Sequence, residues 1–438
     1  MTAHAARQTG RRTNVRWFIV GMAFLATAIN YIDRANLGAA APYITKEFAL
    51  SPATMGLILG AFHWTYAVMQ IPSGWFIDRV GPKLAYTLAV VWWSIFTAAS
   101  ALARGAASLF GFRLLLGAGE APAYPSNAKV VSEWFPRSER ALATAFYDSG
   151  ARVGAALALP IVAAIIAAVG WRTSFVVTGA LGLLWAMLWL AVYKSPREHK
   201  RVSAEELAHI ESDRAAPAPV AGDAGPAAVQ AARPVRWVDL FRYRAIWGMM
   251  LGFFCVNFIA YFFITWFPTY LVKARGFGLL KLGSVGMIPP LVSVPAEFLG
   301  GWVSDRLVKR GVSLTWARKI PLVAGLLLSS SIALAVVVPS AAWAVALLSV
   351  SYSGVTFAAA SVWSLPADVA PTRGHVASIG GIQNFASNLA GIVQAYFVGA
   401  MLAKTGGFLV PLMVAGGFSL LGAFSYLVII PEIKPLGE

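Results

Sequence analysis

The sequence predicts an all-α polytopic membrane protein in which twelve transmembrane helices form two six-helix bundles. Three observations support this prediction. Hydrophobic residues make up 58% of the 438 residues and charged residues only 12%, about half the charged fraction of an average soluble domain. Apolar runs of the roughly 20 residues that cross a bilayer recur along the chain. A short motif that follows the second run returns after the eighth.

The apolar runs fall into two groups of six, separated by one long hydrophilic segment. They lie near residues 17–37, 53–77, 83–102, 106–129, 142–166, 173–193, 245–272, 281–304, 317–338, 341–366, 376–402 and 408–430. The polar faces that helices of a soluble bundle would need are almost absent from them. We therefore expect an N-terminal tail (1–16), a first bundle (17–193), a linker (194–244), a second bundle (245–430) and a C-terminal tail (431–438).

The linker and the tails are expected on the cytoplasmic side. Lys and Arg gather in the tail and in the loops of one side, so the positive-inside rule gives both termini a cytoplasmic position (N-in/C-in) in a bacterial inner membrane. The start of the linker is charged and is expected to form a short amphipathic helix. Residues Ala215 to Pro234 are rich in Ala, Pro and Gly and are expected to be a flexible linker.

Composition also excludes several classes of protein. The net charge of +16 arises from cations in short gaps between apolar runs, which indicates topology rather than nucleic-acid binding. The single cysteine, Cys255, permits no intramolecular disulfide. We find no cluster of metal ligands, no nucleophile–base arrangement and no phosphate-binding loop. The sequence therefore predicts neither an enzyme nor a metal, cofactor or nucleotide requirement.

The two halves repeat a motif. Gly74, Asp78, Arg79 and Gly81 follow the second span, and a degenerate copy with Gly301, Asp305 and Arg306 follows the eighth, 227 positions later. In physical terms, the glycine lets two helices approach and the aspartate caps or pairs with a neighbouring helix. A half-chain repeat indicates two related bundles around a central site. In many secondary transporters two such bundles rock against each other, which gives alternating access to the site.

Few charges lie inside the spans, and each costs at least about 2.5–3.5 kcal/mol at the bilayer centre, so each is a candidate functional group. Arg113 and Glu120 are two helical turns apart, about 10 Å on one face. They are too distant to neutralise each other, so each is free to meet a partner from the first span, which carries Asp33 and Arg34. We expect the arginines to bind a small carboxylate substrate and the acids to carry protons, with anion and proton each favouring the other.

Other polar residues in the spans allow more than one interpretation. Asp148 and Arg152, at positions i and i+4, are either a self-neutralising pair or part of the site. Glu297 is interpreted as a local contact rather than a third proton carrier. In the second half, Tyr261, Trp363, Asn384 and Asn388 are expected to bind substrate hydroxyl groups. For the asparagines, hydrogen bonding between helices stays an alternative.

Several segments carry a resemblance to a known family. They are the Gly74 motif, Asn30–Leu37, Trp64–Pro72, Arg113–Pro122, Glu133–Pro136 and Asn384–Leu389. With them the chain resembles the major facilitator superfamily over nearly its whole length, and within it the sugar-acid importers of the anion:cation symporter branch. The resemblance implies proton coupling at Asp33 and Glu120 and substrate binding at Tyr31, Arg34, Tyr66 and Arg113.

The resemblance leaves the substrate open. Many sugar-acid relatives have a glutamine where Ala151 stands, and Arg152 beside it offers a second cation that would suit a diacid such as an aldarate. The expected protein is a monomer in the lipid bilayer that imports an aldonate, aldarate or hexuronate with protons. Import of another carboxylate, such as tartrate or phthalate, and a membrane sensor without transport are the alternatives. Sodium stays open as the coupling ion.

Overall fold

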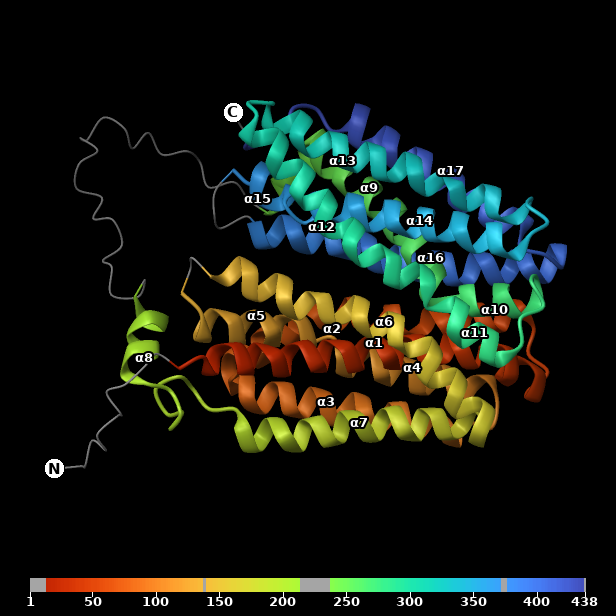
Figure 1. Ribbon diagram of the computed structural model, residues 1–438, viewed down its shortest axis with the longest axis horizontal. Coiled ribbons are helices and arrows are strands. Elements are labelled where there is room, and N and C mark those ends of the chain that lie inside the picture. The colour runs from red at the N-terminus through yellow and green to blue at the C-terminus, as the bar shows by residue number, and fades with distance from the viewer. Residues whose placement is uncertain (1–12, 137–138, 213–236, 372–375, 437–438) are drawn as a thin grey trace.

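The computed structural model describes residues 13–136, 139–212, 237–371 and 376–436, and every regular element within these ranges is helical (Figure 1). The helices of the first half are α1 (Val15–Glu47), α2 (Pro52–Val80), α3 (Pro82–Ala99), α4 (Ala106–Glu120), α5 (Ala123–Trp134), α6 (Arg140–Val169) and α7 (Trp171–Val192). A short helix, α8 (Ala204–Glu211), follows. The second half contains α9 (Arg244–Thr265), α10 (Phe267–Lys273), α11 (Leu279–Gly286), α12 (Ile288–Lys309), α13 (Leu314–Ser329), α14 (Ala341–Val362), α15 (Leu365–Val369), α16 (Val376–Thr405) and α17 (Leu409–Phe424).

Ten helical segments in the described ranges are long and apolar enough to cross a membrane. The second and fourth predicted spans are not among them. The helix α2 has the length, at 29 residues, but carries polar and charged side chains such as His63, Gln70 and Asp78. The helix α4 has only 15 residues. An all-helical multi-span protein is confirmed, and the count of twelve stays a prediction.

Several predicted spans are interrupted, and prolines explain the breaks. The fourth predicted span ends as a helix at Glu120 and restarts at Ala123, with Pro122 in the gap. The breaks between α9 and α10, α11 and α12, and α14 and α15 each fall just before Pro268, Pro289 or Pro366. A proline lacks the N–H that would continue the helix and disfavours helical geometry in the residue before it. The predicted spans 106–129, 245–272, 281–304 and 341–366 are therefore each built from two consecutive helices, and Leu279–Lys309 and Ala341–Val369 are still long and apolar enough to cross a membrane as single segments.

The first helix is longer than predicted. The apolar run ends near residue 37, but α1 continues to Glu47 and tolerates Pro42 in its interior. Its last turns are stabilised from outside, because Trp171 Nε1 and Arg172 Nη1 each donate to the Glu47 carboxylate at 2.6 Å. The hydropathy pattern therefore gave the apolar part of α1 and missed the part held by polar contacts.

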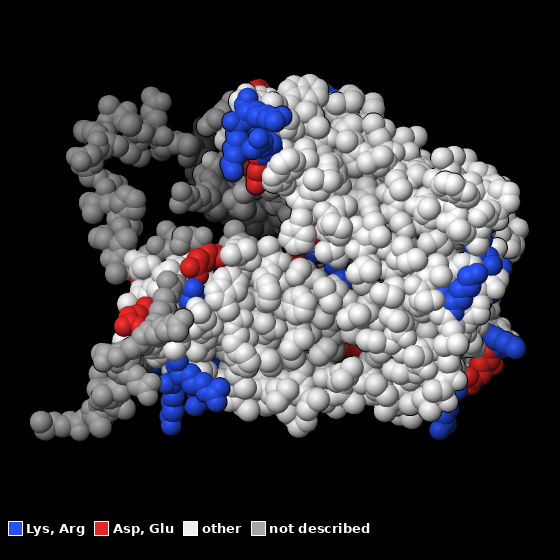
Figure 2. Space-filling view, viewed as in Figure 1, with Lys and Arg blue, Asp and Glu red and all other residues white. Residues whose placement is uncertain are grey.

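In Figure 1, α1 to α7 lie in the lower half of the view and α9 with α12 to α17 in the upper half. The two groups meet along α2 and α16, and again where α10 packs on α1 and α11 on α6. The contact between α2 and α16 requires small residues, because a Cβ atom on Gly56 would lie 2.5 Å from the Ala395 carbonyl oxygen. Figure 2 shows a hollow between the two groups at the opposite end, where α8 lies.

The charged side chains are also unevenly distributed along the length of the helices. On the face in Figure 2, Lys, Arg, Asp and Glu gather at the two ends, and the broad middle is almost entirely free of them. Large apolar side chains, such as Leu102, Met187 and Leu280, are exposed on the surface of the protein. Lipid tails cannot solvate charge, so a belt of this kind is the surface a bilayer requires.

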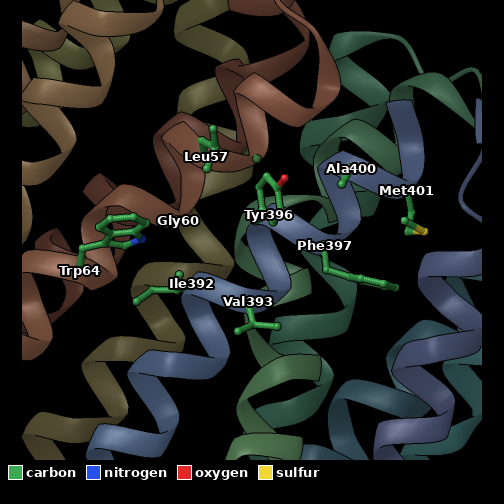
Figure 3. A pocket seen from close by; sticks show the side chains of 10 residues that line it. Leu57, Gly60, Trp64, Ile392, Val393, Tyr396, Phe397, Ala400 and Met401 are labelled. Atoms are coloured by element: carbon green, nitrogen blue, oxygen red, sulfur yellow. The ribbon is translucent and has the colours of Figure 1, made fainter. Parts of the chain in front are cut away.

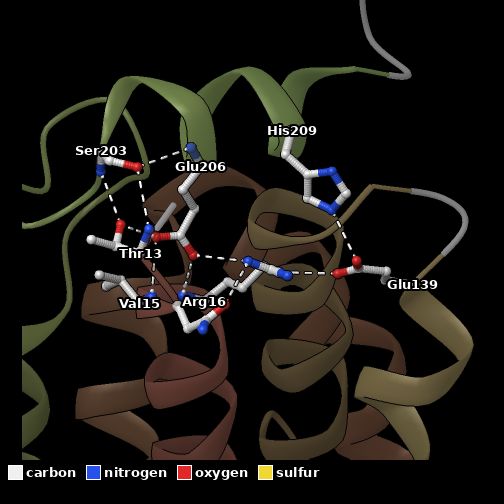
Figure 4. A network of polar contacts seen from close by, with 8 residues as sticks. Thr13, Val15, Arg16, Glu139, Ser203, Glu206 and His209 are labelled. Carbon is white, nitrogen blue, oxygen red and sulfur yellow. Dashed lines mark hydrogen bonds and ion pairs between the residues drawn. The ribbon is translucent and has the colours of Figure 1, made fainter. Parts of the chain in front are cut away.

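The start of the predicted linker forms the expected short helix, α8, and it is tied to the first half (Figure 4). The carboxylate of Glu206 is fully buried. It accepts hydrogen bonds from the backbone N–H groups of Val15 and Arg16, both at 3.1 Å, and pairs with the Arg16 guanidinium at 3.2 Å. The side chain of Asn14 makes no cap, so α8 supplies the N-terminal cap of α1. The flexible segment predicted for Ala215–Pro234 lies outside the described residues.

A second carboxylate extends this network. Glu139, before α6, pairs with Arg16 at 3.0 Å and with His209 of α8 at 2.9 Å. Partial burial works against the charge of Glu139, but the hydrogen bonds from Arg16 and His209 outweigh it, so the pKa of Glu139 is lowered. This contribution to stability is complete above the carboxyl group's ordinary pKa and is lost as the pH falls through the lowered one.

We expect Glu206→Ala to destabilise the protein, because it removes the cap of α1 and leaves the buried Arg16 with Glu139 as its one remaining acidic partner among the described residues. Breaking a buried ion pair costs about 3–5 kcal/mol, which predicts a fall of several degrees in the apparent melting temperature of the detergent-purified protein. The control is Glu205→Ala, one position away on the exposed face of α8. Equal melting temperatures for the two variants would contradict the capping role.

Candidate functional site

A central cavity of about 430 Å³ lies between the two groups of helices. Its walls come from α1, α2, α5 and α6 on one side and from α9, α14 and α16 on the other. The polar side chains that line it are Tyr31, Arg34, Tyr66, Gln70, Tyr124, Tyr147, Asp148, Arg152, Asn257, Tyr261, Tyr352, Thr356, Asn384, Ser387 and Asn388. The cavity therefore combines charged groups from the first half with uncharged polar groups from the second.

Arg34 is the cation that links the cavity to the interior of the first half. Its guanidinium lies 5.0 Å from the ring centroid of Tyr31 and 4.9 Å from that of Tyr66, and both tyrosines also line the cavity. Its Nε donates to Glu120 Oε2 at 2.7 Å. Its Nη2 has no hydrogen-bond partner among the described residues. Aromatic faces hold a guanidinium in place, so Arg34 is held at a fixed position on the cavity wall.

Glu120 lies behind Arg34, away from the cavity. It ends α4, is fully buried and does not line the cavity. Its Oε1 has no hydrogen-bond partner in the described part of the chain. The spacing of Arg113 and Glu120 predicted a first-span partner for the acid, and Arg34 is that partner.

Asp33 is equally buried but has no ionic partner in the described ranges. Neither carboxylate oxygen makes a hydrogen bond there, and the hydroxyl groups of Thr97 and Thr178 are its polar neighbours. The neighbour in sequence, Arg34, faces the cavity instead. A buried carboxyl group without a cation is most easily accommodated as the neutral acid, which is consistent with the predicted proton-carrying role.

Arg113 is not on the cavity wall. It is buried, and its guanidinium lies 5.5 Å from the centroid of the Phe62 ring, whose centroid is also 4.6 Å from the Arg34 guanidinium. Its Nε and Nη1 have no hydrogen-bond partner within the described residues. The partner that we expected from the first span is therefore not seen for Arg113, and its substrate-binding role stays a prediction.

The four candidates from the second half all line the cavity. Tyr261 lies 3.4 Å from Ser387 through their hydroxyl groups. Trp363 is 55% exposed and packs edge to face on Phe253. Asn388 donates to the Asn384 carbonyl oxygen at 3.0 Å and keeps its own Oδ1 unpaired among the described residues.

Asn384 contacts the other half of the molecule. Its Nδ2 donates to Gln70 Oε1 of α2 at 3.0 Å. This is hydrogen bonding between helices, the alternative that we left open for the asparagines. Asn384 also lines the cavity, so the same side chain is placed for both roles.

Asp148, Arg152 and Glu297 form one cluster that crosses between the halves. Arg152 Nη1 lies 2.9 Å from Asp148 Oδ2, and Arg152 Nε and Nη2 contact Glu297 of α12. Tyr124 donates to Asp148 Oδ1 at 3.1 Å. Glu297 is therefore a contact of Arg152, from a distant part of the sequence rather than a local one. Arg152 is neutralised by two acids, so it is not the free second cation that would suit a diacid.

The repeated motif is partly as expected. Asp78 pairs with Lys129 of the neighbouring α5 at 3.0 Å, and Asp305 lies 3.8 Å from Arg318 of α13. The guanidinium of Arg79 stacks over the Trp75 ring, while Arg306 lies exposed in the last turn of α12. Gly81, with φ of 84°, lies between the two helices as the C-cap of α2 and the N-cap of α3.

Close helix approach does not explain the motif glycines in this structure. A Cβ atom on Gly74 would meet nothing within 4 Å, and one on Gly301 would meet only Ala360 at 3.8 Å. In the second half the close approach is one residue earlier, at Gly300 beside the Phe357 carbonyl group. The role that we expected for Gly74 and Gly301 was therefore wrong for the contacts seen here.

Sequence reasoning missed several cavity residues: Gln70, Tyr124, Tyr147, Tyr352, Thr356 and Ser387. Each is a polar side chain within a predicted span, which is the one signal that could have found it. The signal is weak, because tyrosine, threonine and serine also satisfy themselves within a helix. Which of these polar side chains line the cavity depends on how the two halves of the molecule face each other.

A second depression, of about 500 Å³, lies between α2 and α16 (Figure 3). Leu57 and Trp64 from α2 and Ile392, Val393 and Phe397 from α16 line it, and its described lining residues carry no charge. An anion would lose its hydration there without gaining a partner. The central cavity is therefore the better candidate for a functional site.

Comparison with known proteins agrees with this architecture. Residues 23–395 match the model of the Major Facilitator Superfamily. A D-galactonate transporter of Escherichia coli O6:H1 is 39% identical over 99% of both chains. A probable galactarate/D-glucarate transporter, GudP, of Bacillus subtilis is 36% identical, covering 97% of this chain and 94% of its own. GarP of Escherichia coli K12, with the same probable function, is 37% identical over 96% of each chain.

A solved structure shows the same fold. The crystal structure of a bacterial homologue of the human lysosomal transporter Spinster, in an inward-facing and unoccupied conformation, aligns with a TM-score of 0.71 at 20% identity, covering 96% of this chain and 95% of its own. The fold, the span pattern and the family match together define a transporter, not an enzyme. The chain belongs to the Major Facilitator Superfamily. Within it, the chain is a multi-pass transporter of the inner membrane.

Proposed function

We propose that this chain imports a sugar acid together with protons, by alternating access of two six-helix bundles. The observation that carries the proposal is the position of Arg34, which lies on the cavity wall with the buried Glu120 2.7 Å behind it. The substrate carboxylate binds Arg34 from the cavity side. The names of the relatives, galactonate and galactarate/D-glucarate transporters, support a sugar acid as the substrate.

The coupling follows from competition for one guanidinium. In the absence of substrate, Arg34 stabilises the charged form of Glu120. When the substrate carboxylate occupies Arg34, this stabilisation weakens and Glu120 takes up a proton. Anion and proton then each strengthen the binding of the other, as linkage requires. Asp33, buried without an ionic partner in the described ranges, is proposed as the second proton carrier.

The second half is proposed to bind the hydroxyl groups. Tyr261, Asn384 and Asn388 offer donors and acceptors across the cavity from Arg34, and the Trp363 indole offers a flat face for C–H groups. Arg113 is proposed to reach the substrate only when Phe62 moves aside, because that ring packs against both guanidinium groups.

Topology and assembly complete the proposal. Twelve spans, with α2 and the α4–α5 pair added to the ten apolar segments, bring both termini to one side, and the positive-inside rule makes that side the cytoplasm. The hollow beside α8 then opens to the cytoplasm, and the α2–α16, α1–α10 and α6–α11 contacts close the other side. A monomer contains the whole cavity.

Uptake into proteoliposomes tests this function. We expect D-galactonate to accumulate against its gradient when the outside is more acidic. When a protonophore removes the pH difference, we expect uptake to stop once the inside and outside concentrations are equal. Lipid vesicles without protein are the control. Accumulation that follows a sodium gradient and ignores pH would overturn proton coupling, and absence of any uptake of sugar acids would overturn the function itself.

A further inference from the structure

The charged side chains on the central cavity wall are unevenly paired. Among the described lining residues they are Arg34, Asp148 and Arg152. Arg34 has one acidic partner, which lies outside the cavity, and its buried Nη2 makes no hydrogen bond among the described residues. Arg152 has two acidic partners. Only one of the two guanidinium groups on the wall is therefore able to accept a further carboxylate.

Every nitrogen of the Arg152 guanidinium is occupied. Nη1 donates to the Asp148 side chain at 2.9 Å and to the Asp148 carbonyl oxygen at 3.1 Å. Nε and Nη2 both face the carboxylate of Glu297, which holds them as a fork. One cation and two carboxylates leave the cluster with a formal charge of −1 when all three groups are ionised.

The cluster lies away from Arg34 along the cavity. Gly150 and Gly154 of α6 pack against the backbone of Phe24 and Ala28 of α1. Arg152 is therefore level with about residue 26 of α1, eight positions before Arg34. At 1.5 Å per residue this is about 12 Å along the helix axis. Arg34, Asp148 and Arg152 nevertheless line one cavity, so an acid bound to Arg34 shares that cavity with the cluster.

Resting on the function proposed above, we propose that this site selects sugar acids with one carboxylate, and that Asp148 and Glu297 are the residues that determine this specificity. The Asp148 carboxylate, on the cavity wall, accepts hydrogen bonds from the hydroxyl groups at the uncharged end of an aldonate. Glu297, which is not among the lining residues, acts as a positioning residue that keeps Arg152 occupied. A second carboxylate at that end, as in an aldarate, meets like charge and finds no free N–H group on Arg152. Repulsion built against a competing ligand is a common source of specificity.

The test compares two acids that share a carbon skeleton, D-galactonate with one carboxylate and galactarate with two. Uptake of each is measured in proteoliposomes at a pH where both are ionised, and the quantity reported is the ratio of kcat/KM values in one protein. A ratio cancels any effect on the conformational cycle that both substrates share. For the wild-type chain we expect a ratio of at least about 10 in favour of galactonate, the usual size of a discrimination of about 1.4 kcal/mol.

Removing one negative charge from the Asp148–Arg152–Glu297 cluster is expected to reduce the preference for galactonate over galactarate. Glu297→Gln frees part of the Arg152 guanidinium for a second carboxylate, so the ratio falls at least about fivefold. Asp148→Asn, from the other half of the molecule, is expected to change it in the same direction, which keeps the test valid if one variant does not fold. The control is Glu432→Gln, an exposed acid near the C-terminus, with wild-type uptake of both substrates.

Each outcome decides the proposal. A wild-type protein that takes up both acids equally, or a ratio that neither variant changes, would overturn the specificity role while leaving sugar-acid transport intact. Uptake of neither acid by the wild-type protein would instead overturn the proposed function, and this inference with it.

Discussion

Glu120→Gln is expected to abolish the accumulation of sugar acid driven by a pH gradient while leaving exchange of substrate across the membrane. The glutamine has nearly the shape of the acid and can still accept a hydrogen bond from Arg34, which the wild-type carboxylate does at 2.7 Å. It cannot release or bind a proton. Binding of the substrate to Arg34 is then no longer linked to protonation of residue 120. The proton gradient can therefore no longer drive accumulation of the substrate.

The measurement uses two assays on the same proteoliposomes. Counterflow, with unlabelled D-galactonate inside and labelled D-galactonate outside, is expected to stay within about a few fold of the wild-type rate. Uphill uptake with an acidic exterior is expected to fall to the level of vesicles without protein. Asp33→Asn is the companion variant, because Asp33 is the other buried acid of the site. If Glu120→Gln still accumulates substrate uphill in response to pH, the proposed coupling role is wrong.

Arg34→Lys is expected to reduce kcat/KM for uptake by about 100-fold, although it keeps the positive charge. An arginine fork binds Glu120 on one side and a carboxylate on the other, and its planar group fits between the Tyr31 and Tyr66 rings. A lysine offers a point charge without this geometry. Truncation of a buried charged partner usually costs about 2–5 kcal/mol, and about 100-fold corresponds to about 2.8 kcal/mol.

Loss of folding must be separated from loss of binding in this variant. Arg34→Ala alone leaves Glu120 as an unpaired buried charge, which is strongly destabilising. The double variant Arg34→Ala with Glu120→Gln removes both charges and is expected to recover most of the wild-type melting temperature without recovering uptake. Uptake by that double variant at a rate near the wild-type one would show that Arg34 does not bind the substrate.

Much of the fold could be predicted from hydropathy, because a bilayer imposes the length and composition of each span. Hydropathy alone does not reveal the interruptions at Pro122, Pro268, Pro289 and Pro366, since an apolar run continues through each of them. The end of α1 at Glu47 could not be read from the same pattern. It depends on polar contacts with Trp171 and Arg172 of another helix.

The candidate site was predicted less evenly. The spacing of Arg113 and Glu120 indicated partners on the first span, and the structure supplies Arg34 for Glu120. The same spacing said nothing about Phe62, whose ring lies beside Arg113 and leaves it off the cavity wall. Side-chain direction depends on what packs against each helix, and an axial repeat of 1.5 Å per residue does not contain that information.

The sequence by itself determined that this chain is a membrane transporter with buried Asp, Arg and Glu side chains, because a bilayer makes every intramembrane charge conspicuous. Only the tertiary structure decided which of these charges meet. Arg152 and Glu297 are separated by 145 positions, and Gln70 and Asn384 by 314. No helical period relates such distant residues. Their pairing depends on how the two halves of the chain face each other across the cavity, which packing sets and local pattern does not.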